Sequence, residues 1–247
     1  MNEPVHVFLS LPNYGGIDPE TMVGVIMCGG SESIKATFKV RTPDSLLARG
    51  FNYLYSEALN GRKQYGYTHF AMVHSDVGPE HGWLAKMITE QQRLDCGILS
   101  AVIPIKTKQG FTSTGVYDPA TQNIERLKLR YTLQLPLTFG REDVTSSDKM
   151  LVVNTGLLLI DIRKPFVDAT EEIEGCKFLK CHFEIKDSIL VQDDGTYDPR
   201  GLSEDWHYSV MAAREGATIY ATHKIEVTHY GRYGFKNTKE YFDSWGE

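Results

Sequence analysis

The chain has 247 residues, of which 41% are hydrophobic and 23% are charged, and its formal net charge is −6. This composition is typical of a globular protein whose core is large enough to fold without disulfides. The negative balance disfavours a dedicated nucleic-acid binder, although it leaves room for a local basic patch.

The first part of the chain alternates between two hydrophobic patterns. Apolar runs rich in β-formers predict buried strands, and amphipathic stretches with a capping residue or an N-terminal proline predict helices. The predicted order is strand 5–11, helix 19–27 started by Asp18 and Pro19, strand 33–40, helix 46–59 capped by Asp44 or Ser45, and strand 66–73. This alternation predicts a mostly parallel sheet with helices on both faces, which binds ligands at the carboxyl ends of its strands.

The second part of the chain mixes shorter strands with loops. We expect a helix from 79 to 93, a strand over 96–104, a mobile loop over 106–115, a strand over 123–135 and a strand over 150–162 with a turn at 154–156. A surface loop over 187–203, a helix over 204–215 and strands over 218–220 and 224–227 follow. We predict one domain over 1–247, with a nucleotide-binding half at 1–105 and an acceptor-binding half at 106–247.

Cysteine usage and the N-terminus indicate a cytoplasmic protein. The spacing of Cys176, Cys181 and His182 matches no standard zinc pattern, so the four cysteines are interpreted as reduced thiols. The N-terminus has no basic and apolar leader pattern. The longest apolar stretch, residues 150–162, is interrupted by polar residues and is too short to span a bilayer.

Polar residues gather where predicted strands end or helices begin. His74-Ser75-Asp76 follows the strand at 66–73, and Asn154-Thr155-Gly156 precedes the run Gly-Leu-Leu-Leu-Ile. Ser203-Glu204-Asp205-Trp206 opens a helix, and His229-Tyr230-Gly231 follows a short strand. Each segment alone has a simpler structural interpretation, because Asp76 could cap a helix and Ser203 and Glu204 suit a first helical turn.

In this order, the four segments resemble glycosyltransferase family 2-like enzymes of the GT-A superfamily, from about Val5 to Gly231. The helix that carries Arg49 and Asn52 matches the family in part, and His74 stands where the family usually has the first residue of Asp-x-Asp. The resemblance implies an α/β fold of the GT-A type, with a Rossmann-like, mostly parallel mixed sheet flanked by helices. It implies a glycosyltransferase, a hexosyltransferase by expectation, that moves a sugar from a nucleotide-sugar donor, with UDP-sugars favoured, to an acceptor hydroxyl.

The resemblance also implies a role for each matching residue. Asp76 and His229 are the expected ligands of Mn²⁺ or Mg²⁺, which would neutralise the leaving diphosphate. Asp205 is the expected base of an inverting reaction, and Glu204 would orient the site. The expected donor-binding residues are Leu11, Pro12, Asn13, Arg49, Asn52, His74, Ser75 and Lys106, with Tyr14 beside the base and ribose. The expected acceptor-binding residues are Trp206, Tyr230 and Gly156.

Other functions stay open at this level. A nucleotidyltransferase is the first alternative. Such enzymes usually have a basic residue in the loop after the first strand. Residues 12–18 contain neither Lys nor Arg, which disfavours this alternative. A nucleotide-sugar-binding protein without catalysis is the second alternative, favoured by His74. The acceptor is a glycan, a small molecule or a hydroxymethylated base in phage-type DNA. For DNA, Arg126, Lys128 and Arg130 would share one strand face, which is otherwise a routine solvated face.

Overall fold

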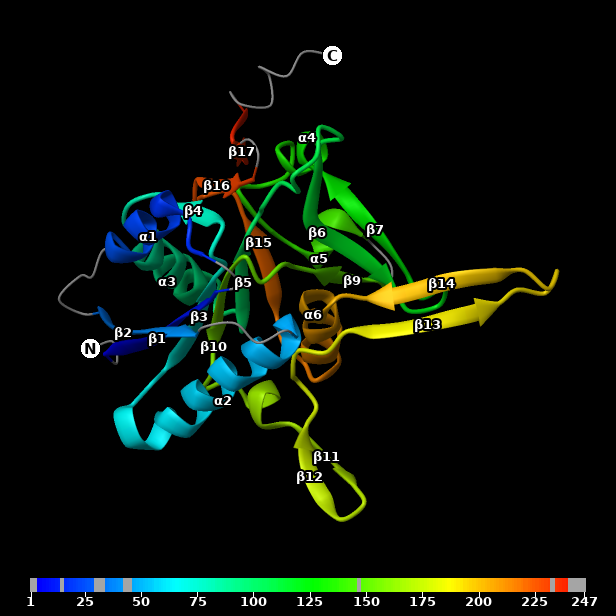
Figure 1. The fold of residues 1–247 in the computed structure, drawn as a ribbon, viewed down its shortest axis with the longest axis horizontal. Coiled ribbons are helices and arrows are strands. Elements are labelled where there is room, and N and C mark those ends of the chain that lie inside the picture. Colours follow the sequence, from blue (N-terminus) through cyan, green and yellow to red (C-terminus); the bar gives the residue numbers. More distant parts are fainter. Residues whose placement is uncertain are drawn as a thin grey trace.

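The computed structural model describes residues 4–13, 16–28, 34–41, 46–145, 148–231 and 234–239. Its centre is a seven-stranded sheet, counted within these residues, in the order β2-β1-β3-β10-β5-β15-β8 (Figure 1). The pairings make β2, β1, β3, β5 and β15 run in one direction, and β10 and β8 in the other. The strands are β1 (Val5–Pro12), β2 (Ile34–Arg41), β3 (His69–Val73), β5 (Ile98–Ala101), β8 (Thr138–Gly140), β10 (Leu157–Asp161) and β15 (Ile219–Thr222). The prediction of a mostly parallel α/β sheet is therefore confirmed.

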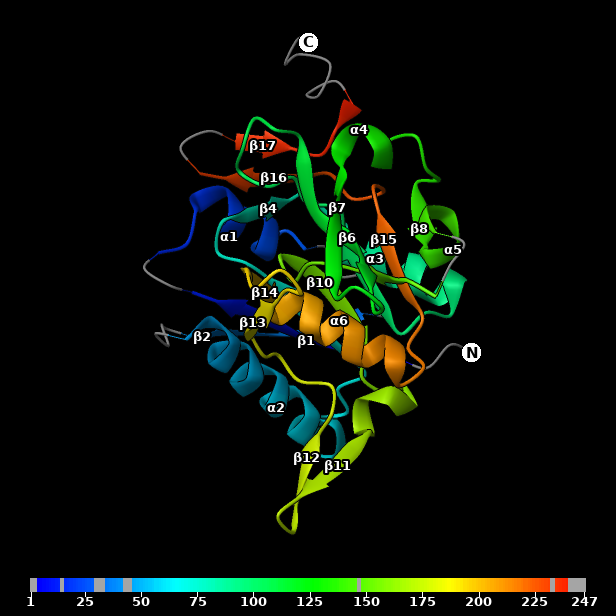
Figure 2. The same cartoon turned by 90° about the vertical axis from the view of Figure 1, so that its right-hand side faces the viewer.

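Helices cover both faces of this sheet because its strands alternate apolar side chains between them. One face packs Phe8, Phe70 and Met72 against helix α2 (Leu47–Tyr65) and helix α6 (Glu204–Arg214). The opposite face packs Leu9 and Ala71 against helices α1 (Pro19–Ile26) and α3 (Trp83–Leu94). Figure 2 shows α2 and α6 side by side on their face of the sheet. The result is a three-layer α/β/α core.

Four smaller sheets and several short elements complete the described fold. The smaller sheets are β7-β6-β9, β17-β16-β4 and two separate hairpins, β11-β12 and β13-β14. Their strands are β4 (Val77–Pro79), β6 (Phe111–Asp118), β7 (Asn123–Lys128), β9 (Met150–Val152), β11 (Thr170–Ile173), β12 (Cys176–Leu179), β13 (Lys186–Val191), β14 (Tyr197–Leu202), β16 (Val227–Tyr230) and β17 (Gly234–Lys236). The short helices are α4 (Leu129–Thr132), α5 (Arg141–Val144) and the 3₁₀ helix η1 (Pro165–Asp168). None of the helices in the described ranges is both long and apolar enough to cross a membrane.

The predicted helix starts and stops are partly confirmed. Asp18 caps α1, where its side chain accepts a hydrogen bond from the Glu20 amide at 3.3 Å, and Pro19 occupies the first turn. Helix α2 continues six residues beyond the predicted end, to Tyr65, and Gly66 caps it in the left-handed region at φ 73°. The predicted caps Asp44 and Ser45, and Ser33 of the second strand, lie outside the described residues.

Of two predicted loops, one is a strand in its second half and the other is a hairpin. The segment predicted as a mobile loop over 106–115 enters β6 at Phe111, because Thr112 and Thr114 point inward and are fully buried. The predicted surface loop over 187–203 is the β13-β14 hairpin, which projects from the body (Figure 1). The run Asp193-Asp194-Gly195 forms the turn of this hairpin, where the Gln192 amide donates to the Thr196 carbonyl at 2.9 Å.

Two predicted strands are shorter than expected. Strand β7 ends at Lys128 and Arg130 belongs to α4, so the predicted single strand face carrying Arg126, Lys128 and Arg130 does not exist. The stretch over 150–162 is divided between β9 and β10, which belong to different sheets. The turn that separates them lies at the carboxyl edge of the central sheet, beside the end of β3.

Candidate functional site

Three separate segments bring a carboxylate, an ammonium and an imidazole together at the edge of the sheet. Asp76 follows β3, Lys106 follows β5 and His229 lies in β16. The Lys106 ammonium forms an ion pair with Asp76 Oδ2, and His229 Nε2 lies 3.6 Å from the same oxygen. Backbone hydrogen bonds hold the segments of Asp76 and His229 together, since β4 pairs with β16 and the Tyr230 amide donates to the Asp76 carbonyl at 2.7 Å.

The ring of His229 is oriented by the backbone. Its Nδ1 lies 2.8 Å from the carbonyl oxygen of Pro104, which can only accept a hydrogen bond. In the neutral imidazole, Nδ1 therefore carries the proton and Nε2 carries the lone pair. Nε2 is the ring atom that faces the Asp76 carboxylate, and a backbone carbonyl behind the ring is the usual support of a metal-binding histidine.

The electrostatics of the cluster keep Asp76 charged. Partial burial by itself raises the pKa of a carboxyl group, but the contacts from His229 and Lys106 outweigh it and hold the pKa of Asp76 well below its usual range. Asp76 is therefore an anion at neutral pH, and its side chain remains 39% exposed, so that a ligand can reach it.

His74 lies beside this cluster but is committed to another partner. Its Nε2 lies 3.0 Å from the Thr155 hydroxyl, and its ring packs 5.2 Å from the ring of Phe51. Burial lowers the pKa of His74 to about 4, so the imidazole is neutral at pH 7. The adjacent Ser75 uses its carbonyl to accept from the Asp18 amide at 2.8 Å. His74 thus joins the end of β3 to the 154–156 turn.

A second acidic group lies at the start of α6. One carboxylate oxygen of Asp205 accepts from the Ser203 hydroxyl and, at 2.8 Å, from the Trp206 amide. Burial raises the pKa of Asp205 to about 6, and the neighbouring charge of Glu204 acts in the same direction. Ser203 stands at the N-cap position of α6, as the sequence predicts, but its hydroxyl makes no capping bond to the helix backbone.

Trp206 supports Asp205 from the side of the small sheet. Its indole Nε1 donates to the Ser113 carbonyl at 3.0 Å, and the Arg126 guanidinium lies 4.3 Å above its ring. The positive charge of Arg126 lowers the pKa of Asp205, against the larger effect of burial. From the sequence, Arg126 was predicted only to lie on a charged strand face. No local pattern indicates its contact with Trp206.

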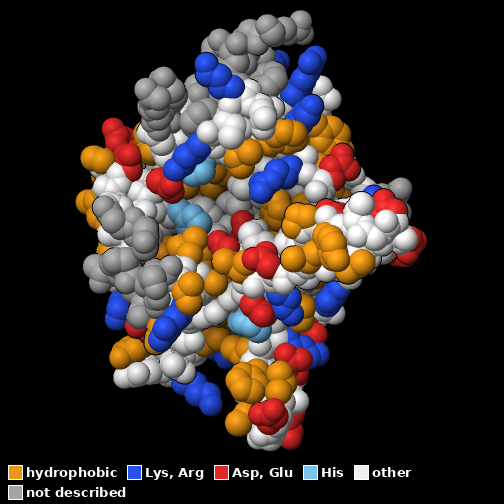
Figure 3. Space-filling model, turned by 45° about the vertical axis from the view of Figure 1, so that its right-hand side comes forward, with side chains coloured by type: hydrophobic (Ala, Val, Ile, Leu, Met, Phe, Trp, Pro, Cys, Tyr) orange, Lys and Arg blue, Asp and Glu red, His pale blue; other side chains and the backbone are white. Residues whose placement is uncertain are grey.

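A short segment connects the two acidic centres. The Ser209 hydroxyl, one turn after Asp205 in α6, lies within hydrogen-bond distance of the Val153 amide at 3.1 Å and donates to the Asp205 carbonyl at 3.0 Å. Two residues after Val153, Thr155 contacts His74. Figure 3 shows a hollow on this side of the molecule with histidine, acidic and basic side chains around it.

The remaining predicted donor-binding residues are less exposed or have structural partners. Leu11 and Pro12 are buried at the end of β1, and the Asn13 side chain accepts from the Gly16 amide at 2.9 Å. Tyr14 lies outside the described residues. Arg49 is exposed on α2 and donates to the Tyr53 hydroxyl at 3.4 Å. Asn52 links α2 to the segment before β13, since its amide pairs with both backbone groups of Phe183 at 2.7 and 2.9 Å.

Two of the predicted acceptor-binding residues have close-packed positions. A Cβ on Gly156 would lie 2.6 Å from Ile103 Cδ1, and the Gly156 carbonyl accepts from the His74 amide at 2.9 Å. The ring of Tyr230 lies over Gly78, where a Cβ would come within 2.7 Å of it. Gly156 therefore lets the turn approach the sheet, and Tyr230 joins β16 to β4.

The donor set fits a divalent cation that takes its other ligands from substrate and water. Within the described ranges, no group of three or more His, Cys, Asp and Glu side chains is placed to hold a metal. Asp76 and His229 supply one oxygen and one nitrogen donor, and Mg²⁺ commonly takes only one or two protein carboxylates together with substrate phosphates. All four cysteines are free, as expected.

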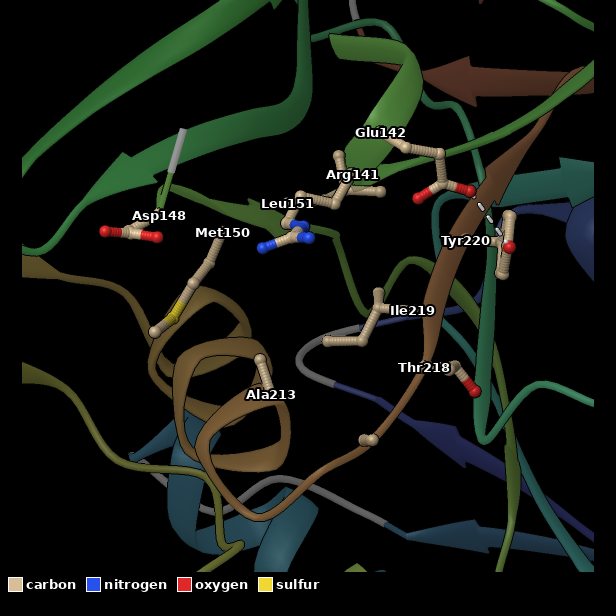
Figure 4. Close-up of a pocket in the computed structure, with 10 residues that line it drawn as sticks. Arg141, Glu142, Asp148, Met150, Leu151, Ala213, Thr218, Ile219 and Tyr220 are labelled. Atoms are coloured by element: carbon tan, nitrogen blue, oxygen red, sulfur yellow. Dashed lines mark hydrogen bonds between the residues drawn. The ribbon is translucent and has the colours of Figure 1, made fainter. Parts of the chain in front are cut away.

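A separate hollow of about 330 Å³ lies near the other end of α6 (Figure 4). Residues of α5, β9, α6 and β15 line it, and Tyr220 donates a hydrogen bond to Glu142 at 3.0 Å on its wall. None of the residues that line this hollow was predicted from the sequence to bind donor, acceptor or metal, or to act in catalysis. We therefore place the candidate site at the Asp76 cluster and the start of α6.

Comparison with known proteins supports the fold and leaves the family open. No protein-family model matches the sequence, and no curated protein shows significant sequence similarity to it. The solved structure of A197 from STIV is similar, with a TM-score of 0.54 and 12% identity over 92% of this chain and 86% of that chain. At this identity, the similarity concerns the fold alone.

Two further solved structures are more distant. A UDP-glucose pyrophosphorylase complexed with UDP-glucose gives a TM-score of 0.40 and 10% identity over 98% of this chain and 97% of that chain. The synthetase of CMP:2-keto-3-deoxy-manno-octonic acid, complexed with CTP, gives 0.32 and 8% over 63% and 73%. TM-scores this low establish no shared fold, so the function must be argued from the site.

Proposed function

We propose that this protein is a glycosyltransferase that uses a nucleotide-sugar donor, with UDP-sugars favoured. The observation that carries the proposal is the convergence of Asp76, Lys106 and His229 from three segments at the carboxyl edge of the sheet. Ligands of open α/β sheets bind at this edge. A cluster of an anion, a cation and an imidazole is suited to a diphosphate, directly through Lys106 and through a cation held by Asp76 and His229.

Asp205 provides the second requirement, which is a base for the acceptor hydroxyl. A carboxylate with a pKa of about 6 is mostly ionised at pH 7 and is a stronger base than an exposed aspartate. In the proposed step, Asp205 takes the hydroxyl proton while the acceptor oxygen bonds to the anomeric carbon. The bond from that carbon to the phosphate oxygen breaks, and its electron pair leaves with the nucleoside diphosphate. The sugar configuration would invert.

The other residues act on binding and position. Lys106 is placed to neutralise charge on the leaving phosphate oxygens, and a bound Mn²⁺ or Mg²⁺ would add Lewis-acid stabilisation of the same charge. Glu204 and Trp206, on either side of Asp205, are placed to orient the acceptor. His74 holds the 154–156 turn against the end of β3, so that both acidic centres keep their relative position.

A donor screen tests this function. Nucleoside diphosphate release is measured for a panel of nucleotide sugars with Mn²⁺, with Mg²⁺ and with a chelator, in the presence of candidate glycans, small hydroxylated metabolites and hydroxymethylated DNA. We expect UDP-sugars to be turned over and the Asp205→Asn variant to lose turnover. A nucleotidyltransferase would instead release pyrophosphate from a nucleoside triphosphate, and binding without turnover of any donor would indicate a non-catalytic binding protein.

A further inference from the structure

The Asp76 carboxylate lies between an imidazole and an ammonium group. Its Oδ2 is 3.6 Å from His229 Nε2, on a ring that the Pro104 carbonyl orients through Nδ1. A partly buried carboxylate is stabilised by a cation at contact distance. In the described structure, the Lys106 ammonium supplies this cation by contacting Asp76 Oδ2.

Lys106 is held at this position by its own stem as well as by its charge. A Cβ built on Gly231 would lie 2.9 Å from Lys106 Cδ, so the aliphatic part of the lysine runs across the surface that the missing side chain leaves open. Gly231 follows Tyr230, whose amide is bonded to the Asp76 carbonyl. The backbone beside His229 therefore guides Lys106 toward Asp76.

A divalent cation bound to Asp76 and His229 would need the same oxygen that Lys106 contacts. The ammonium and the metal ion would repel each other strongly at contact distance, because the site is partly desolvated. The Lys106 side chain is 33% exposed and has four rotatable carbons, so it can leave without disturbing the fold. Once displaced, its charge lies beside the place that the donor phosphates would take.

We propose that Lys106 is an exchangeable counter-ion. It neutralises Asp76 in the metal-free protein, gives up that oxygen when Mn²⁺ or Mg²⁺ binds, and then contacts the donor diphosphate. This inference rests on the proposed function for the identity of the diphosphate. The competition between Lys106 and the metal rests on the geometry of Asp76 and His229 alone.

Manganese binding to the full chain without nucleotide tests the competition. Free Mn²⁺ is measured by electron paramagnetic resonance for the wild type, Lys106→Met, Lys106→Arg and Lys108→Met. Because Lys106→Met removes a repelling charge from the metal's ligand, we expect it to bind Mn²⁺ about tenfold or more tightly than the wild type. Lys106→Arg keeps the positive charge and should bind Mn²⁺ as tightly as the wild type. Lys108→Met keeps Lys106 and removes an exposed charge two residues away, so its Mn²⁺ affinity should also equal that of the wild type.

Nucleotide binding tests the second half of the inference. With saturating Mn²⁺, calorimetry should show UDP binding to Lys106→Met about tenfold more weakly than to the wild type, because one charge-assisted contact is lost. Circular dichroism and thermal unfolding verify that the variant is folded. Lys106→Met would then bind Mn²⁺ more tightly and UDP more weakly than the wild type. Misfolding cannot produce these opposite changes in the two affinities.

Several results would overturn the inference. Mn²⁺ affinity of Lys106→Met equal to or below that of the wild type, or no Mn²⁺ binding to any variant, would show that Lys106 does not hold a metal position. Unchanged UDP affinity would remove the phosphate contact. Failure of the proposed function is distinguishable, because it appears as absence of turnover for every nucleotide sugar in the donor screen, whereas the Mn²⁺ titration contains no donor.

Discussion

Replacing Asp205 with Asn should separate the stability of this protein from its activity. The fold raises the pKa of Asp205 from 3.8 to about 6. Between these two values, the folded chain binds a proton that the unfolded chain releases, so stability falls as the pH rises through this window and the deficit is complete above about pH 6. A carboxylate with a raised pKa therefore destabilises the folded state at pH 7.

The shift is about two pH units, and each unit corresponds to about 1.4 kcal/mol. Since Asp205 keeps some contact with solvent, we expect a deficit of about 2 kcal/mol at pH 7 rather than the full value. Asn cannot ionise, and its oxygen can still accept the hydrogen bonds from Ser203 and Trp206. Asp205→Asn should accordingly be more stable than the wild type by about 2 kcal/mol at pH 7.

Urea unfolding at a series of pH values measures this difference. We expect the advantage of Asp205→Asn to be largest above pH 6 and to vanish below about pH 4. Glycosyl transfer should be reduced at least about 100-fold at pH 7 and above, where the wild-type carboxylate is ionised. An advantage that is independent of pH, or a variant less stable than the wild type at pH 7, would refute the reasoning that burial raises this pKa. Full activity in the variant would refute the assignment of Asp205 as the base.

Three more variants report on other parts of the structure. Asp76→Asn should lower the rate of nucleoside diphosphate release about 100-fold or more, whereas Asp194→Asn in the exposed hairpin turn should leave it unchanged. Arg126→Met removes a charge that lowers the pKa of Asp205, so the acid limb of the pH profile of kcat/KM should move to higher pH. Gly24→Ala places a Cβ 2.7 Å from the backbone oxygen of Pro79 and should lower the free energy of unfolding by about 2 kcal/mol in urea.

Most of the central sheet was predictable because β1, β3, β5 and β10 are apolar runs with clear ends, whereas the three-residue strand β8 was not predicted. Val5–Pro12 and His69–Val73 are buried along their whole length, and the helices between them start or stop at Asp18, Pro19 and Gly66. These signals are local. The hairpin over 186–202 was missed because β13 is exposed along its whole length and β14 is at most half-buried, so that no apolar period marks either strand.

The residues of the candidate site were identified from the sequence, but only some of the contacts between them were predicted. Asp76 and His229 were expected to share a ligand, and the structure brings them together through the pairing of β4 and β16. The involvement of Lys106 with Asp76 depends on a long-range meeting of two strand ends that no local pattern encodes. Likewise, the contact of Thr155 with His74 follows from the position of β10 and not from either motif.

The place of β10 in the sheet has a consequence for synthesis on the ribosome. Strand β10 lies between β3 and β5 and pairs with both, although it follows β5 in the chain by more than fifty residues. Until residue 161 has left the exit tunnel, β3 and β5 each present an unpaired edge with buried apolar neighbours, which is a surface prone to wrong pairing. The nascent chain should therefore require protection over this interval. Ribosome-bound chains that expose β5 but still hold β10 in the tunnel should recruit chaperones more than longer chains in which residue 161 has emerged.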